Sequence, residues 1–172
     1  MNKNKLPFLK DNIHTILHGS KAEKEKLIGK SFYLAETPEY MKEKGLKGDF
    51  FSIKYGVISR HLGKDSDHNL SEKNWKELCK VIIKPFAISK YGKDFRLFTT
   101  VKLNNNYIVV GVNVKSIGKW IEVNSICTVF GYFQKNKGVE EIVYRDKKIT
   151  PEQTALLDGL NSLSLPSVQG ST

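Results

Sequence analysis

The stretch DFRLFTTVKLNNNYIVVGVNVKS, residues 94–116, decides the expected fold. Apolar and polar residues alternate on either side of the three asparagines, and this period of two is typical of half-buried β-strands. The stretch predicts a hairpin with strands near 94–103 and 107–116 and a turn at the asparagines. Two further alternating runs, IEVNSICTVF (121–130) and VEEIVYR (139–145), extend the hairpin to four antiparallel strands.

A helix is predicted ahead of these strands by apolar residues that recur at positions i, i+3, i+4 and i+7: Trp75, Leu78, Cys79 and Ile82. Ser71 is its expected N-cap, and Pro85 ends it. A shorter helix is expected with Thr37 as cap and Pro38 in its first position, and a last helix after Thr150. Because most helices precede the strands, the order indicates an α+β fold, with N-terminal helices packed on a C-terminal four-stranded antiparallel sheet.

The length of 172 residues fits one domain. We expect a helical, lysine-rich lead-in at residues 1–30, the folded domain at 31–158 and a flexible tail at 159–172. No apolar run approaches the roughly 18 residues of a membrane helix and no signal peptide is recognised, so a cytoplasmic location is expected. Cys79 and Cys127 sit among apolar residues, which favours small buried side chains over a disulfide or a zinc site.

The net charge is the first indication of a partner. The chain has 28 Lys and Arg against 18 Asp and Glu, a formal charge of +10, and the excess is spread along its length. A folded surface this basic favours a polyanionic partner such as RNA. Only Arg60, Arg96 and Arg145 are arginines, so the same excess also fits an ordinary lysine-rich soluble protein.

One face of the predicted sheet collects polar side chains, because alternate residues of a strand point to opposite sides. Superposing the polar sides of the strands puts seven residues on one surface: Arg96, Thr100, Lys102, Asn113, Lys115, Asn124 and Thr128. A solvated outer sheet face would look the same. The cationic and hydroxyl-bearing character of this surface is also what contact with RNA phosphates requires.

Four histidines are candidates for proton transfer or metal binding. His14 and His18 are spaced i, i+4, but no HExxH pattern or adjacent carboxylate completes a site, so we interpret them as surface or packing residues and expect no metal. His61 and His68 lie in a loop rich in Gly, Asp and Ser ahead of the main helix. Loops often carry catalytic side chains, which makes these two the better candidates.

Four short segments resemble a known family: TPEYMKEKGL (37–46), HLGKDSDHNL (61–70), KPFAI (84–88) and VNSICTVFG (123–131). With the Trp/Leu helix among them, they are similar to the phage MuF C-terminal domains and related phage nucleases of the barnase/EndoU/colicin/RelE-like superfamily. The resemblance covers residues 31–158 and implies a compact α+β ribonuclease fold without a cofactor. Many such domains are fused to larger phage or mobile-element proteins, so this chain is an excised domain or a stand-alone version. A host must survive its own ribonuclease, so an immunity protein is an expected partner.

The resemblance assigns the family's functional positions to four residues: His61, His68, Asn124 and Thr128. His68 matches the family's histidine before the main helix, and His61 is a second candidate. Thr128 keeps the hydroxyl where serine is commoner. The dipeptide Gly131-Tyr132 stands where a basic residue often follows. Lys135 or Arg96 would then supply the missing phosphate contact.

RNA carries its own nucleophile, the 2′-hydroxyl, so its cleavage needs a base, an acid and cations rather than a metal. His61 and His68 are the expected acid and base, because imidazole titrates near neutral pH. Arg96 would stabilise the developing charge, and Asn124 and Thr128 would bind the phosphate or orient a histidine. Further contacts to RNA are expected from six residues: Lys84, Tyr91, Thr100, Lys102, Lys115 and Tyr132.

Other functions fit the same sequence. A non-catalytic RNA-binding module would use the same basic sheet, and a phage protein-interaction or inhibitor domain would expose an apolar patch. A transferase on a nicotinamide cofactor fits less well, because no Arg…Ser-x-Ser…Glu-x-Glu set is present and Glu140 and Glu141 are adjacent. The sequence therefore favours a metal-independent endoribonuclease of the toxin type.

Overall fold

The computed structural model describes residues 6–60, 62, 69–117, 121–131 and 140–164, and in this part of the chain seven strands form one mixed sheet. Their order across the sheet is β1-β2-β6-β5-β4-β3-β7. The strands are β1 (Ser31–Glu36), β2 (Phe50–Lys54), β3 (Ala87–Tyr91), β4 (Asp94–Leu103), β5 (Asn106–Ile117), β6 (Ile121–Gly131) and β7 (Glu141–Arg145). Neighbouring strands are antiparallel except β2 and β6, which run parallel.

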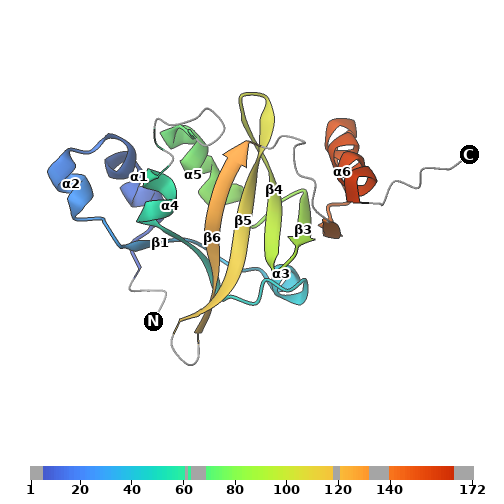
Figure 1. Cartoon of the computed structure of the whole chain (residues 1–172), viewed down its shortest axis with the longest axis horizontal. Coiled ribbons are helices and arrows are strands. Elements are labelled where there is room, and N and C mark those ends of the chain that lie inside the picture. Colours follow the sequence, from blue (N-terminus) through green and yellow to red (C-terminus); the bar gives the residue numbers. More distant parts are fainter. Residues whose placement is uncertain (1–5, 61, 63–68, 118–120, 132–139, 165–172) are drawn as a thin grey trace, which may run out of the picture.

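The helices of the described part are α1 (Leu9–His18), α2 (Lys21–Glu25), α3 (Glu39–Glu43), α4 (Tyr55–Ser59), α5 (Glu72–Val81) and α6 (Pro151–Ser164). Figure 1 shows α1, α2, α4 and α5 gathered on one side of β6, and α6 at the opposite end, beyond β3. Helices from the two ends of the chain therefore cover different parts of the sheet.

The predicted four-stranded antiparallel sheet is wrong, although the fold is α+β. The runs 94–103, 107–116 and 121–130 form the adjacent antiparallel strands β4, β5 and β6. The fourth predicted strand became β7, which pairs with β3 instead of β6. The strands absent from the prediction, β1, β2 and β3, have only five or six residues each. Runs this short give little periodic signal, so their pairing could not be anticipated.

Two clusters of buried side chains lie on opposite faces of the sheet. On what we call the first face, Ile13 of α1 and Leu78 of α5 belong to the same large core as Val110 of β5. On the second face, Leu157 of α6 belongs to a smaller core with Phe98 of β4. The sheet is therefore sandwiched between the N-terminal helices and the C-terminal helix.

The predicted lead-in and tail both reach these cores. α1 buries Leu9, Ile13 and Ile16 in the first-face core, so the helix within residues 1–30 packs into the same unit as the rest. α6 continues past residue 158 and buries Leu160 on the second face, while residues 165–172 lie outside the described part. Among the described residues, no helix has both the length and the apolar composition needed to cross a bilayer.

The helix caps follow the sequence with one exception. Ser71 accepts a hydrogen bond from the Asn74 amide, and Thr150 accepts one from the Gln153 amide, as their N-cap roles require. The predicted Thr37 cap is wrong, because Pro38 is the N-cap residue of α3 and makes no side-chain cap bond. The hydroxyl of Thr37 instead faces the sheet.

A β-bulge in β6 changes which side chains share a face. Gly111 of β5 pairs with Thr128, but the next residue of β5, Val112, pairs with Ile126. Cys127 is therefore an extra residue in β6, and the alternation of its side chains reverses there. Thr128 lies on the second face beside Gly111, whereas Asn124 lies on the first face with Ile126. The predicted common surface for Asn124 and Thr128 is wrong for this reason.

Candidate functional site

Four residues form a row across the second face of the sheet: Ser89, Arg96, Gly111 and Thr128. They lie at paired positions on β3, β4, β5 and β6, and we call them the Arg96 row. The Thr128 methyl group occupies the space beside Gly111, because a Cβ at Gly111 would lie only 2.5 Å from Thr128 Cγ2. With strands roughly 4.8 Å apart, the backbones of Arg96 and Thr128 are about 10 Å from each other.

Arg96 is held in place from several sides. Its Nη1 lies 3.5 Å from Oε2 of Glu140, and its guanidinium carbon lies 4.3 Å from the Tyr91 ring centroid and 5.9 Å from that of Phe130. The Glu140 side chain is only 3% exposed, and the Ser89 hydroxyl donates a hydrogen bond to its other oxygen. The Arg96 side chain keeps 14% of its surface exposed. A guanidinium fixed in this way can stabilise a nearby anion with little reorganisation.

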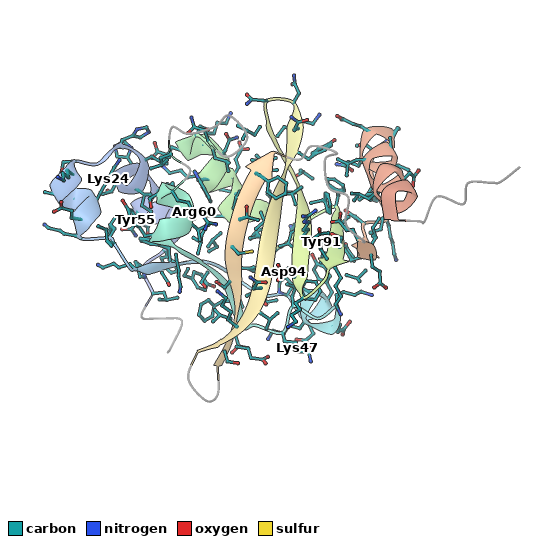
Figure 2. The ribbon with its side chains drawn as sticks, viewed as in Figure 1. Lys24, Lys47, Tyr55, Arg60, Tyr91 and Asp94 are labelled. Atoms are coloured by element: carbon teal, nitrogen blue, oxygen red, sulfur yellow. The ribbon has the colours of Figure 1, made fainter. Side chains whose placement is uncertain are left out.

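Arg60, which precedes the two candidate histidines in the sequence, contacts β6 next to Thr128. β2 pairs with β6 only as far as Ile126, and the chain then turns into α4. At the end of α4, Arg60 Nη2 donates a 2.7 Å hydrogen bond to the carbonyl of Cys127, the residue before Thr128. Figure 2 shows Arg60 beside α4, on the other side of β6 from Tyr91 and Asp94. The next residue, His61, and also His68 lie outside the described part of the chain.

Asn124 is a structural residue on the opposite face. Its side chain is fully buried, and Oδ1 accepts a 3.1 Å hydrogen bond from the Gly48 amide. Nδ2 lies 2.9 Å from the Thr37 hydroxyl, 3.0 Å from the Gly48 carbonyl and 3.3 Å from the Leu46 carbonyl. These contacts fix residues 37–48 against β6. In this structure Asn124 does not face the Arg96 row.

The remaining candidates are dispersed. Lys115 is exposed on the second face, four residues along β5 from Gly111 and thus roughly 13 Å away. Thr100 is exposed where β4 loses regular pairing with β5, and Lys84 is exposed after α5. Tyr132 lies outside the described residues. The structure therefore brings Arg96, Tyr91 and Thr128 together on one face and leaves the others apart.

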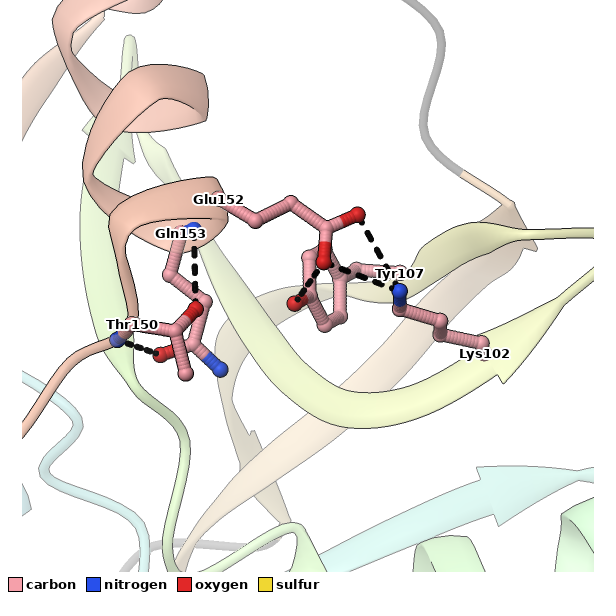
Figure 3. A network of polar contacts seen from close by, with 5 residues as sticks. All are labelled: Lys102, Tyr107, Thr150, Glu152 and Gln153. Atoms are coloured by element: carbon pink, nitrogen blue, oxygen red, sulfur yellow. Dashed lines mark hydrogen bonds and ion pairs between the residues drawn. The ribbon is translucent and has the colours of Figure 1, made fainter.

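Lys102 contacts α6. Its Nζ lies 3.1 and 3.0 Å from the two carboxylate oxygens of Glu152, and the Tyr107 hydroxyl donates to the same carboxylate at 3.0 Å (Figure 3). Thr150 and Gln153 close the first turn of α6 next to this contact. The expected RNA-binding lysine thus joins the β4–β5 hairpin to the helix that covers the second face.

This contact predicts an acid-sensitive attachment of α6. Hydrogen bonds from Lys102 and then from Tyr107 lower the pKa of Glu152 below its ordinary value of 4.5. The contribution of the ionised Glu152 to the stability of the folded protein is therefore complete above pH 4.5. It is lost as pH falls through the lower pKa of Glu152 in the folded state. Thermal unfolding is measured at pH 7, 5 and 3. The melting temperature should fall more with decreasing pH for the wild type than for Glu152→Gln. Parallel losses in the two proteins would contradict this contribution.

The other titratable candidates lie away from the Arg96 row. His14 Nδ1 is 3.2 Å from a Glu72 oxygen, and the His14 and His18 rings are 5.3 Å apart. In the described part of the chain, no group of three or more His, Cys, Asp or Glu side chains could hold a metal ion. Both cysteines are free, and burial raises the pKa of Cys79 to about 11 and also raises that of Cys127. Their thiols are therefore protonated at neutral pH and weakly nucleophilic.

Four residues around Arg96 were not predicted as site residues: Ser89, Gly111, Phe130 and Glu140. Glu140 is the most informative of them, because a buried carboxylate beside an arginine is costly unless it is paired. A lone glycine in the alternating run of β5 was the one available sequence signal, since such a glycine often marks close approach of a neighbour. Nothing in the sequence pairs Glu140 with Arg96, 44 residues earlier.

Comparison of the chain with protein-family models, with curated proteins and with solved structures found no match in any of the three. The resemblance to phage nucleases therefore depends on the four segments quoted above and stays a prediction.

Proposed function

We propose that this chain is a metal-independent endoribonuclease that binds RNA on the second face of its sheet. The observation that carries the proposal is the arrangement around Thr128. A clamped guanidinium, Arg96, shares a row with the Thr128 hydroxyl, and Arg60 holds the start of the histidine loop to the carbonyl of Cys127. The net charge of +10 supports a polyanionic partner.

In the proposed reaction, one histidine of the 61–70 loop removes the proton from a 2′-hydroxyl. The oxygen attacks the adjacent phosphorus, and the bond to the 5′-oxygen breaks as the second histidine protonates that leaving oxygen. Arg96 stabilises the negative charge that develops on the phosphate oxygens, and the Thr128 hydroxyl donates to one of them. The products end in a 2′,3′-cyclic phosphate and a 5′-hydroxyl.

The biological setting belongs to the same proposal. An RNA-cleaving domain of the phage or mobile-element type acts in the bacterial cytosol, where its substrate is. An immunity protein that blocks the active face would protect the cell that makes it. The segments resembling MuF C-terminal domains support both expectations.

The two histidines supply the direct test. RNA cleavage in EDTA is compared for the wild type, His61→Ala and His68→Ala, because loss of a general acid or base costs roughly 10²–10⁴-fold. His14→Ala and His18→Ala are matched controls, since both rings are exposed on α1, and they should cleave like the wild type. If His61→Ala and His68→Ala both retain activity within a few-fold, the two-histidine mechanism is wrong. Salt-sensitive RNA binding without turnover would instead indicate a non-catalytic RNA-binding module.

A further inference from the structure

A groove of about 520 Å³ lies where α1, β1 and α5 meet, away from the Arg96 row. Two aromatic residues, Phe8 and Tyr33, line it together with lysines from both helices. Phe8 is 46% exposed, one of the few large apolar side chains at the surface of the described part. Its ring lies 5.3 Å from that of Tyr33, at an interplanar angle of 63°. The groove thus has a partly exposed aromatic wall, in which the Tyr33 ring also packs against buried Phe50.

The charges around this wall are mostly positive. Lys10 of α1 and Lys76 and Lys80 of α5 line the groove, against Asp11 as the acidic residue. Lys10 Nζ lies 5.5 Å from the Phe8 ring centroid, so an ammonium and an aromatic face occupy the same part of the groove. This combination suits a group that is both planar and anionic. In single-stranded RNA, the base stacks on aromatic rings while lysines contact the phosphates.

We propose that the groove is a second RNA-binding site, which holds one nucleotide of a single-stranded substrate outside the cleavage site. Phe8 and Tyr33 receive the base, and Lys10 and Lys80 contact the flanking phosphates. The groove lies beside the first-face helices α1 and α5, and Thr128 lies on the second face. RNA bound at both places would pass around the edge strand β1, which is two strands, roughly 10 Å, from β6. This inference rests on the proposed function, because it assigns the groove to the same substrate.

Binding is measured with a fluorescent single-stranded 12-mer of 2′-O-methyl RNA, which lacks the nucleophile and is not cleaved. Phe8→Ala should weaken binding about 5–100-fold, the range for loss of one stacking contact. The double variant Lys10→Ala/Lys80→Ala should also weaken binding. It should reduce the slope of log K against log salt concentration by the amount expected for about one to two lost phosphate contacts. The matched controls are Ile28→Ala, an exposed apolar residue outside the groove, and Lys44→Ala/Lys47→Ala, which removes the same charge elsewhere.

Equal losses of 12-mer affinity in the groove variants and in their controls would overturn the inference, since binding would then not depend on the groove. Displacement of the 12-mer by micromolar uridine or adenosine monophosphate would also overturn it, because the groove would then be a site for free nucleotides. Cleavage of a dinucleotide should be unchanged in Phe8→Ala, since so short a substrate does not reach the groove. If the wild type cleaves no RNA but Phe8→Ala still loses 12-mer binding, the proposed activity fails while the binding site stands.

Discussion

Replacing Asn124 by alanine should lower the free energy of unfolding by about 2–4 kcal/mol. The substitution leaves the buried amide and carbonyl of Gly48 without their partner, together with the Leu46 carbonyl and the Thr37 hydroxyl. Urea unfolding monitored by circular dichroism measures the loss.

Two further variants make this result specific. Asn113→Ala removes the same side chain from the second face of β5, where it is partly exposed, and should change stability by less than about 0.5 kcal/mol. Gly48→Ala should be destabilising like Asn124→Ala, because its Cβ would lie 2.2 Å from the Asn124 backbone nitrogen. An Asn124→Ala protein as stable as Asn113→Ala would contradict the structural role of this residue.

Arg96→Lys should lower kcat/KM for RNA by about 10²-fold or more while the protein stays folded. Lysine keeps a positive charge near the buried Glu140 but cannot reproduce the planar, multiply donating guanidinium that lies on the Tyr91 ring. Alanine is a poorer test, because it would leave Glu140 buried without its cation and would destabilise the fold.

The matched control is Arg145→Lys. Arg145 Nη2 lies 3.8 Å from Asp158 Oδ1 at the surface. This change should therefore leave RNA cleavage within a few-fold of wild type. Thermal unfolding of both variants separates an effect on the reaction from an effect on folding. Wild-type activity in a folded Arg96→Lys protein would exclude Arg96 as the group that stabilises the transition state.

Alternation in the sequence predicted the centre of the sheet well. β4 covers residues 94–103 as expected, and the caps at Ser71 and Thr150 are confirmed. Each of these features is local, since strand alternation and helix capping depend on neighbouring residues. The same locality explains why Arg96 could be placed on a polar face from β4 alone.

Apart from the Thr37 cap, the failures are non-local. Asn124 was assigned to the wrong face because the extra residue Cys127 reverses the alternation of β6, and a bulge depends on how two strands pair. The parallel pairing of β2 with β6 joins segments more than 60 residues apart, for instance Phe51 with Asn124. Glu140 was missed as the partner of Arg96 for the same reason. Each of these contacts is made by the tertiary fold and leaves no periodic trace in the sequence.

The proposed RNA cleavage on the second face is tested most directly by the ends of the RNA products. The wild-type chain is incubated in EDTA with an RNA oligomer and with the same oligomer carrying a single 2′-deoxy nucleotide at the cut position. We predict 2′,3′-cyclic phosphate ends from the first substrate and no cleavage at the deoxy position of the second. Cleavage of the deoxy position at a similar rate, or products with a 5′-phosphate, would contradict attack by the 2′-hydroxyl.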